Sequence, residues 1–331
     1  MIKREDLRNR IFFEHSNQSF ERLALDVFRY QALENRLYSE WINALGTEVS
    51  KVNSWKDIPF MPISFFKSHR VISGLLDPEL TFRSSGTTGS IPSIHYIYDA
   101  NLYKESIIKG FSRVFGNPSG WNFLALLPSY LERQDSSLVH MMQVLMQESV
   151  QPVNGFFLHN YDELLSTLSR LYASHQKVWL IGVSFALLDF AAFRPPAWDN
   201  LVVIETGGMK GKRREMIRQE LHEEIKKDWP LNSIESEYGM TELLSQAWTN
   251  KDGFFQTPPW MRISIKEPDD PFTESAIGNT GGVCITDLAN LDSCAFISTS
   301  DLGKMLPHGG FEITGRFDNS DLRGCNLLAE I

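Results

Sequence analysis

The sequence predicts an α/β fold with a β-rich portion toward its C-terminal end. Between residues 122 and 237, short apolar runs alternate with longer segments whose apolar residues recur at helical spacing. This alternation is typical of a largely parallel sheet with crossover helices. From residue 260 onward, short β-type runs are separated by turn residues. That change indicates a smaller antiparallel or barrel-like subdomain packed on the first part.

The first elements along the chain are expected to be helical. Residues 19–45 carry apolar side chains such as Leu23 at helical spacing, and Gly46 follows as a stop signal. The proline-punctuated segment 59–67 is expected to be a connector. Asp99 is a candidate cap for the helix that follows it.

The remaining elements alternate and then become β-rich. Strands are expected at residues 122–127, 154–158, 178–181 and 201–204. Helices are expected at residues 136–148, 161–174, 185–193 and 212–229. Short strands of the C-terminal part are expected at residues 262–265, 282–285 and 295–297. Two further strand-like runs, at residues 94–98 and 233–237, border the motifs described below.

The composition is that of an ordinary globular enzyme, with 42% hydrophobic and 22% charged residues. The net charge of −9 argues against a general nucleic-acid or membrane-surface binder. No apolar run is long enough to span a bilayer, so we expect no integral membrane association. The three cysteines are well separated and the N-terminus carries no signal region. We therefore expect a cytoplasmic protein without structural zinc.

A run of hydroxyl-bearing residues and glycines occupies residues 84–93. Glycine lets the backbone turn tightly, and successive N–H groups in such a turn form a concave anion site to which Ser and Thr hydroxyls add donors. The run is not a Walker A motif, because no lysine follows Gly89. We interpret it as a phosphate-holding loop, with a surface turn as the alternative. The candidate phosphate contacts are Ser84, Ser85, Gly86, Thr87, Thr88, Gly89 and Ser90.

Three further short motifs follow this loop in order. Tyr-Gly-Met-Thr-Glu occupies residues 238–242, Ser-Asp-Leu-Gly residues 300–303 and Gly-Arg-Phe-Asp residues 315–318. Together with the loop, they resemble the motifs of the adenylate-forming enzyme superfamily. That superfamily includes acyl-CoA synthetases, the adenylation domains of peptide synthetases and firefly-type luciferases.

The resemblance implies ATP and Mg²⁺ as cofactors. In the implied reaction a substrate carboxylate attacks the α-phosphate of ATP and pyrophosphate leaves. Glu242 is then the implied Mg²⁺ ligand, Thr241 the contact to the α-phosphate, and Gly239 part of the nucleotide-binding segment. Magnesium typically takes one or two carboxylates beside phosphate oxygens. The structural alternative is a helix start capped by Thr241.

The nucleoside is implied to contact other segments of the chain. Gly207 and Gly208 are expected to lie against adenine, and Tyr238 offers an aromatic face to it. Asp301 is the ribose candidate, because a carboxylate can accept two hydroxyl hydrogen bonds. Arg316 is expected to reach ribose or phosphate.

The sequence departs from typical superfamily members after the last motif. Typical members continue into a smaller lid domain that carries a lysine, whereas this chain stops at Ile331, and Ser93 replaces the lysine that often ends the loop. The short architecture and the run Leu-Leu-Pro-Ser-Tyr-Leu-Glu-Arg at 126–133 resemble the LuxE-type acyl-protein synthetases. Those enzymes move the acyl group from the adenylate to their own cysteine. Cys325 is the candidate nucleophile here, with an incidental cysteine as the alternative.

The resemblance thus implies an adenylate-forming domain, with parallel sheets, flanking helices and a β-barrel-like subdomain, that lacks the usual lid domain. Its expected parts are residues 1–258 as the α/β adenylation core, 259–316 as a β-rich subdomain of the same domain, and 317–331 as a truncated hinge and tail.

We expect the substrate to be an apolar carboxylic acid of the fatty-acid class. The candidate pocket side chains are Phe156, Phe157, Leu158 and Phe185, with ordinary core residues as the alternative. The acyl acceptor stays open between Cys325, coenzyme A and an acceptor protein. An AMP-forming acyl-CoA or aryl-CoA ligase is therefore the rival interpretation.

A second rival is an α/β-hydrolase. Residues 182–186 read Gly-Val-Ser-Phe-Ala at a predicted strand-to-helix junction, close to a Gly-x-Ser-x-Gly nucleophile elbow. Ser184 would then be the nucleophile, with His308 completing a triad. Because the last position is Ala186, we prefer a pocket wall at this turn.

Overall fold

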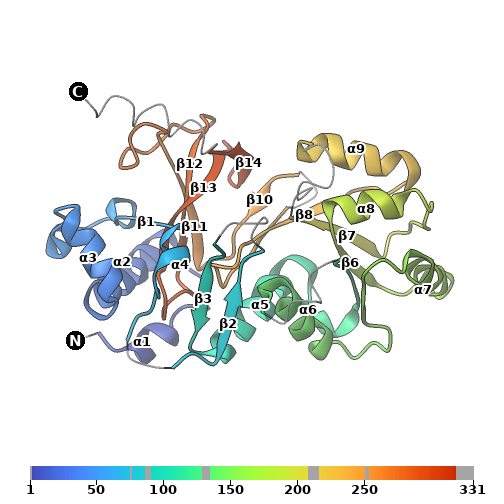
Figure 1. The fold of residues 1–331 in the computed structure, drawn as a ribbon, viewed down its shortest axis with the longest axis horizontal. Helices are drawn as coiled ribbons and strands as arrows, with labels where there is room; N and C mark the ends of the chain where they lie inside the picture. Colours follow the sequence, from blue (N-terminus) through green and yellow to red (C-terminus); the bar gives the residue numbers. More distant parts are fainter. Residues whose placement is uncertain are drawn as a thin grey trace.

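The computed structural model describes residues 2–74, 77–85, 91–128, 135–207, 216–249 and 253–317. Its strands form a hydrogen-bonded path that changes from parallel to antiparallel at β8 (Figure 1). The parallel half contains, in spatial order, β5 (Gly155–Phe157), β4 (Asn122–Leu126), β6 (Val178–Val183), β7 (Leu201–Thr206) and β8 (Glu235–Tyr238). The antiparallel half continues with β9 (Ala247–Thr249), β10 (Phe255–Gln256), β14 (Phe311–Arg316), β13 (Phe296–Met305), β12 (Gly281–Asp287) and β11 (Met261–Lys266).

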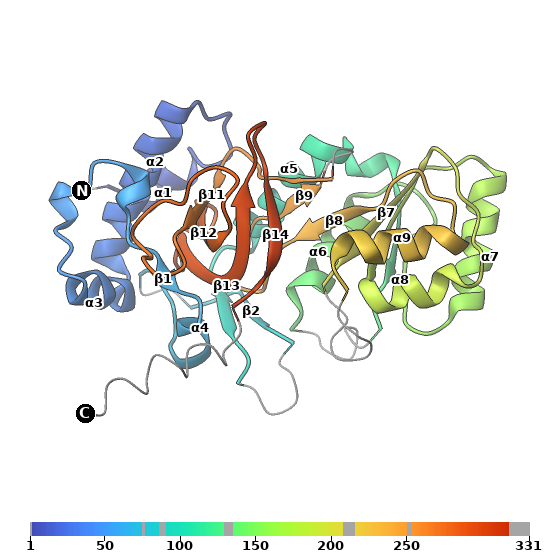
Figure 2. The same ribbon diagram turned by 90° about the horizontal axis from the view of Figure 1, so that it is seen from above.

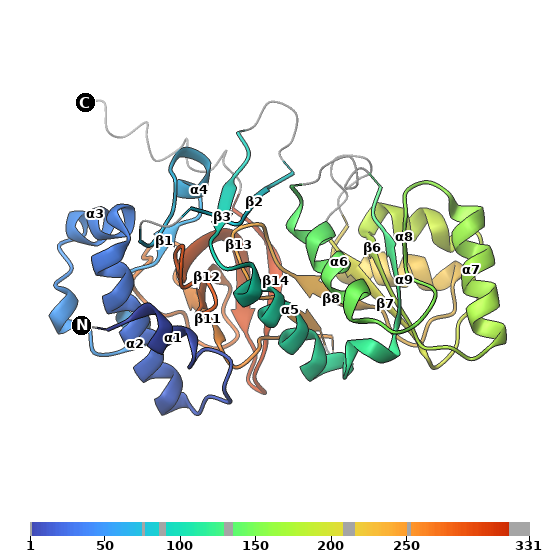
Figure 3. The same ribbon diagram turned by 90° about the horizontal axis from the view of Figure 1, so that it is seen from below.

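Helices cover both faces of the parallel half. They are α5 (Ala100–Phe115), α6 (Ser137–Glu148), α7 (Tyr161–Ala173), α8 (Ser184–Ala191) and α9 (Arg218–Asp228). Helices α8 and α9 lie in front of β6 and β7 in Figure 2, whereas α5 and α6 lie in front of the sheet in the opposite view of Figure 3. Every residue of β4 and β6 is buried, as expected for parallel strands covered on both faces.

Trp179 on β6 is at the centre of the core beneath α5. Its ring packs edge-on against Phe111 and Phe115 of α5, with centroids 5.5 and 5.7 Å away. It also packs against Phe123 of β4 and Trp248 of β9 at 5.8 and 5.7 Å. This aromatic cluster therefore joins the parallel strands to the first antiparallel strand.

The N-terminal segment packs against the antiparallel half (Figure 1). Its helices are α1 (Arg4–Arg8), α2 (Asn17–Glu34), α3 (Arg36–Ala44) and α4 (Phe65–Ser68). Its short strand β1 (Met61–Pro62) pairs in parallel with β13. Single 3₁₀ turns lie at Val49–Lys51, Trp55–Asp57 and Pro118–Gly120. The rings of Phe28 and Tyr38 both pack on Phe296 of β13.

The predicted alternation of strands and helices is confirmed, although several boundaries differ. The strand expected at 295–297, for example, is β13, which extends from Phe296 to Met305. Two of the expected helices also differ. The long helix expected at 19–45 is interrupted at Asn35, which ends α2 and caps α3 by accepting a hydrogen bond from the Tyr38 N–H at 3.0 Å. Its side-chain amide donates to the Ser293 carbonyl at 2.8 Å. Helix α9 begins at Arg218, and the two described residues before it are not helical.

The expected connector at 59–67 contains β1 and the start of α4. Among the described residues, no helix combines the length and the apolar character needed to cross a membrane.

A buried polar side chain of α2 holds the loop that precedes β13. The amide of Gln31 donates to the carbonyls of Asn290 and Leu291, each at 2.9 Å, and accepts from the Ala295 N–H at 2.9 Å. Gln31 is fully buried. Three backbone groups of this loop therefore depend on one side chain.

We predict that Gln31→Leu destabilises the fold by about 3 kcal/mol, because it leaves several buried backbone groups without partners. Chemical denaturation measures this loss. The matched control is Gln18→Leu, an exposed position of the same helix, with an expected change within about 0.5 kcal/mol. Equal stability of the two variants would contradict the role assigned to Gln31.

Candidate active site

The predicted phosphate loop is carried by a hairpin. Strands β2 (Leu80–Arg83) and β3 (Ile94–Ile97) pair antiparallel, with Arg83 opposite Ile94. The Ser84 N–H donates to the Ser93 carbonyl at 3.0 Å, and the Ser93 N–H donates to the Ser84 hydroxyl oxygen at 2.9 Å. These two bonds close the neck of the loop.

The loop itself is described only at its ends. Ser84 lies at the neck and Ser85 is exposed beside it. The expected phosphate contacts Gly86, Thr87, Thr88, Gly89 and Ser90 lie outside the described residues. Their role therefore stays a prediction.

The hairpin neck meets the downstream motif at Glu242. The Ser93 hydroxyl lies close enough to the Glu242 carboxylate to lower its pKa, and both residues are buried. Burial raises the pKa of Glu242, while Ser93 and the charges of Lys67 and Arg316 act in the opposite direction. Ser93 thus lies beside the Glu242 carboxylate, and Lys67 and Arg316 from distant segments are near enough for their charges to lower its pKa.

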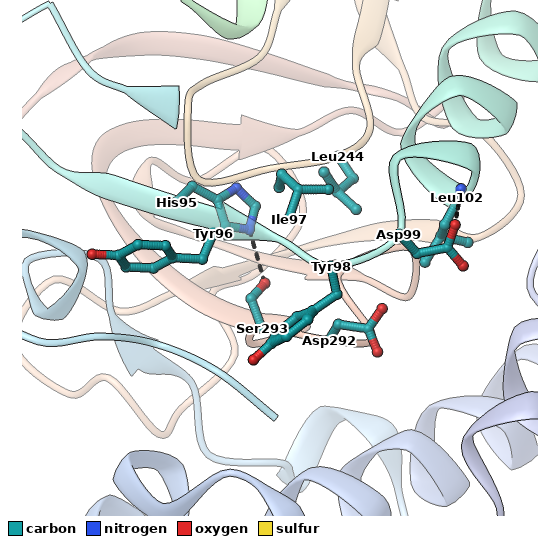
Figure 4. A pocket seen from close by; sticks show the side chains of 9 residues that line it. All are labelled: His95, Tyr96, Ile97, Tyr98, Asp99, Leu102, Leu244, Asp292 and Ser293. Atoms are coloured by element: carbon teal, nitrogen blue, oxygen red, sulfur yellow. Dashed lines mark hydrogen bonds between the residues drawn. The ribbon is translucent and has the colours of Figure 1, made fainter. Parts of the chain in front are cut away.

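His95 of β3 fixes the hairpin both to the same motif and to Ser293, and Figure 4 shows the second of these contacts. Its Nδ1 lies 2.8 Å from the Thr241 carbonyl and its Nε2 lies 2.9 Å from the Ser293 hydroxyl. Burial lowers the pKa of His95 to about 4, so the ring is neutral near pH 7. A neutral ring with a hydrogen on Nδ1 donates to Thr241 and accepts from Ser293.

A buried carboxylate from the antiparallel half shapes the segment after Glu242. Asp287 accepts hydrogen bonds from the N–H groups of Leu244 and Ser245, both at 3.0 Å, and from the Ser245 hydroxyl at 2.7 Å. The Asn290 amide donates to the Glu242 carbonyl at 2.8 Å. Residues 241–242 form a turn and β9 follows, so the alternative of a helix start at Thr241 is wrong.

The structure brings together Tyr238, Asp301 and Arg316, whose roles in nucleoside binding stay predictions. The Tyr238 hydroxyl donates to Asp301 Oδ2 at 2.8 Å, and Arg316 Nε lies 3.0 Å from Asp301 Oδ1. Asp301 and Arg316 are opposite each other on β13 and β14. The Tyr238 ring packs against Phe255 and Phe311. The parallel and antiparallel halves are therefore joined by this bridge.

Gly207 follows β7 with φ of +71°, a conformation that favours glycine. Its carbonyl lies 3.1 Å from the Ser184 hydroxyl. Its expected neighbour Gly208 lies outside the described residues. The strand-to-helix turn that carries Ser184 therefore lies directly beside the predicted adenine-binding turn.

The hydrolase interpretation of Ser184 is wrong. The Ser184 hydroxyl lies 2.5 Å from Glu205 Oε1, and the serine is buried. His222 Nε2 lies 4.0 Å from the other oxygen of Glu205, and His308 is exposed in the β13–β14 turn. The serine–histidine triad considered above needs an imidazole as the direct base of the serine, and here the Glu205 carboxylate occupies that position.

Sequence reasoning missed four residues that build this site: Lys67, His95, Asp287 and Asn290. Each acts on the motif at 238–245 from a distant segment. A histidine in the strand after a phosphate-type loop was a visible signal for His95. The other three follow ordinary surface or turn patterns, which contain no trace of these contacts.

The remaining predicted residues are placed as follows. Phe156 and Phe157 lie in β5, Leu158 follows it, and Phe185 is buried in α8. Cys325 lies outside the described residues. The pocket role of the first four and the acceptor role of Cys325 stay predictions.

The two other cysteines are buried free thiols. Burial raises the pKa of Cys284 to about 11 and of Cys294 to about 12. A thiol with a raised pKa is a poor nucleophile near pH 7. Neither residue is therefore a candidate acyl acceptor.

Comparison with solved structures gives the fold. The open form of a 2-hydroxyisobutyryl-CoA ligase, in complex with 2-HIB-AMP and CoA, aligns with a TM-score of 0.70 at 11% identity. The alignment covers 94% of this chain and 77% of that one. The chain has the fold of adenylate-forming enzymes. No protein-family model and no curated protein matches the sequence.

Two other similar structures extend well beyond the aligned region. ATP-bound MatB from Rhodopseudomonas palustris aligns with a TM-score of 0.52 at 16% identity, over 71% of this chain and 47% of that one. The amide bond synthetase McbA from Marinactinospora thermotolerans aligns with a TM-score of 0.52 at 15% identity, over 71% and 48%. The aligned region thus spans about half the length of these two proteins.

We predict that His95 makes the fold sensitive to acid. Its pKa is lower in the folded protein than in the unfolded chain, so the unfolded chain binds the proton first as the pH falls. Between pH 6.5 and about pH 4 the stability contributed by neutral His95 falls by about 3 kcal/mol. The variant His95→Asn keeps a donor for Thr241 but does not titrate. The difference in free energy of unfolding between wild type and this variant should therefore narrow by that amount as the pH falls.

Denaturation at a series of pH values measures the gap. The exposed His159, replaced by Asn in the same way, is the matched control and should follow the wild-type pH dependence. A gap for His95→Asn that stays constant from pH 7 to pH 4 would contradict the assignment.

Proposed function

We propose that the protein is an ATP-dependent ligase that activates a carboxylic acid as its acyl adenylate. The observation that carries this proposal is the meeting of the loop neck with Glu242 through the Ser93 hydroxyl. A phosphate-type loop and a buried carboxylate at one place match what phosphoryl chemistry on ATP requires. The fold shared with ATP-bound and acyl-AMP-bound ligases supports it.

In the proposed reaction, a carboxylate oxygen of the acid forms a bond to the α-phosphorus of ATP. The bond from that phosphorus to the bridging oxygen breaks, and pyrophosphate leaves. Backbone and hydroxyl donors of the loop at 84–90 hold the phosphates, and Thr241 contacts the α-phosphate. Lys67 and Arg316, which both act on Glu242, supply positive charge at this place. Their charges offset the absence of the lysine that often ends this loop, where the present chain has Ser93.

The donor set at Glu242 fits Mg²⁺. A single carboxylate with hydroxyl neighbours suits an ion bound mainly by phosphate oxygens and water. Among the described residues, no group of three or more His, Cys, Asp or Glu forms a separate metal cage. When bound, Mg²⁺ neutralises charge on the phosphoryl oxygens. Glu242 would hold it, while Ser93 orients the carboxylate.

The adenosine is proposed to lie between the turn at Gly207–Gly208 and Tyr238. Asp301 accepts one hydrogen bond on each oxygen from Tyr238 and Arg316. A carboxylate offers about four acceptor positions, so two remain for a ribose diol. Ribose can therefore bind without breaking the bridge between the two halves.

We propose that the acid is apolar and that its acyl group moves to a thiol, as in LuxE-type enzymes. The Cys325 thiolate would attack the carbonyl carbon of the acyl adenylate, forming a thioester as AMP leaves. The rival is an AMP-forming acyl-CoA or aryl-CoA ligase, which the CoA in the 2-hydroxyisobutyryl-CoA ligase complex favours. An acceptor protein is the third possible destination. The free thiols of Cys284 and Cys294 fit a reducing compartment such as the cytoplasm.

We predict that Glu242→Gln lowers the rate of ATP–pyrophosphate exchange at least about 100-fold, because it removes the charge that holds Mg²⁺. The amide keeps the shape and relieves a buried charge, so stability should stay within about 1 kcal/mol of wild type. Glu220→Gln, at an exposed position of α9, is the control and should keep full exchange. Unchanged exchange in Glu242→Gln would remove this residue from the site.

We predict that Cys325→Ser keeps ATP–pyrophosphate exchange and loses a hydroxylamine-sensitive acyl label. Adenylation precedes thiol attack, and a hydroxyl without an activating base is a far weaker nucleophile. Intact-mass measurement after incubation with ATP and the acid detects the thioester. Consumption of coenzyme A without any acyl mass on the wild-type chain would establish the CoA-ligase alternative instead.

A further inference from the structure

Two polar side chains lie side by side where parallel strands end. Thr206 of β7 pairs with Val183 of β6. On the other side of β7, Ile204 pairs with Glu235 of β8. Two residues further along both strands, Thr206 is therefore level with Glu237. Trp179 packs on α5 and pairs with Val202 of β7, so Val202 is on the face of the sheet that α5 covers. Because side chains alternate between the two faces, Thr206 is on the same face as Val202. Ligands of open α/β sheets bind at this carboxyl edge.

The Glu237 carboxylate is held on one side only. Its Oε2 accepts a hydrogen bond from the Thr206 hydroxyl at 2.5 Å. Its Oε1 lies against Gly239, where an added Cβ would be 2.1 Å from this oxygen. Within the described residues Oε1 accepts no hydrogen bond, and the residue is partly exposed. The oxygen therefore faces the Tyr-Gly-Met-Thr-Glu segment with acceptor capacity to spare.

Glu235, on the same strand, is a glutamate whose hydrogen bonds indicate a purely structural role. It lies two residues earlier on the same face, and it is buried. Its Oε1 accepts from the Ser233 hydroxyl and its Oε2 from the Thr249 hydroxyl, both at 2.9 Å. Both of its oxygens are satisfied by the protein. Glu237, nearer the strand end, has one oxygen to which no described residue donates a hydrogen bond.

We infer that Glu237 selects the acid substrate, with Oε1 accepting a hydrogen bond from a hydroxyl or ammonium group that the acid carries near its carboxyl group. This inference rests on the proposed adenylation function. Glu237 adjoins Tyr238 and contacts Gly239, so a group bound to it lies close to the carboxyl group being activated at Thr241 and Glu242. An acid without such a donor would leave a desolvated carboxylate unpaired, which costs affinity.

The surroundings of Glu237 favour a donor over an acceptor. Burial raises its pKa to about 7, Thr206 acts in the opposite direction, and the charge of Glu205 from β7 adds to the increase. The Tyr103 hydroxyl of α5, which is buried on the same face, donates toward the Ser137 carbonyl. None of these groups is a cation. If the donor is an ammonium group, the KM of the acid should therefore fall as the pH rises through about 7.

The test is ATP–pyrophosphate exchange with sets of acids of equal chain length: unsubstituted, 2-hydroxy, 3-hydroxy and 2-amino. We expect wild type to favour at least one donor-bearing acid by more than 10-fold in kcat/KM. Glu237→Gln should lower kcat/KM for that acid about 10-fold to 100-fold and leave the unsubstituted acid unchanged. The matched control is Glu235→Gln, which should keep the wild-type preference. For an amino acid, the pH dependence of KM should disappear in Glu237→Gln.

A second variant covers the case in which Glu237→Gln does not fold. Thr206→Val keeps the side-chain shape and removes the hydroxyl that positions Glu237, so it should weaken the same preference mainly through KM. Wild type that uses unsubstituted acids equally well would overturn the inference and leave adenylation standing. An equal loss with every acid in Glu237→Gln would also overturn it. If none of the acids supports ATP–pyrophosphate exchange, the proposed function is overturned, and this inference with it.

Discussion

The buried carboxylate of Asp287 is the constraint on which the site geometry depends. It accepts hydrogen bonds from Leu244, Ser245 and Ala289, and it is fully buried. Burial raises its pKa to about 6, so near pH 7 it is predominantly a charge kept in the interior by these donors. The segment after Glu242 has no regular secondary structure to hold it. Asp287 replaces a helix or strand as its support.

The loop that contains this support is itself fastened from the N-terminal segment. Gln31 and Asn35 of the first helices bind residues 290–295, and the Ser73 hydroxyl donates to the Ser293 carbonyl at 2.7 Å. The Ser293 hydroxyl in turn contacts His95. A chain of buried polar contacts thus runs from α2 through this loop to the hairpin neck and Glu242. The helices α1, α2 and α3 contribute to the site by positioning it, whereas Lys67 of α4 acts on Glu242 through its charge.

Local sequence patterns predicted most of the secondary structure, because apolar periodicity reports which face of an element is buried. The strand alternation at 122–206 is of this kind. The break at Asn35 could not be predicted, because its partner Ser293 comes from a distant segment. The motifs pointed to Tyr238, Asp301 and Arg316 as candidates for the nucleoside site, while Lys67 went unnoticed. A motif records residues of one local segment, whereas Lys67 acts on Glu242 by its charge from a distant segment.

The two glutamates of β8 have different roles: Glu235 stabilises the fold, whereas Glu237 is proposed to select the substrate. Glu235 lies where the neighbouring strand β9 supplies a threonine hydroxyl, so the protein satisfies it completely. Glu237 lies beside the end of β7, where the chain turns at Gly207, and no described residue donates to its Oε1. The end of β7 at a glycine turn therefore leaves acceptor capacity at the edge where we propose that the acid binds. An apolar acid that also carries a donor beside its carboxyl group would use both the apolar wall and this oxygen, and an unsubstituted fatty acid would use only the first.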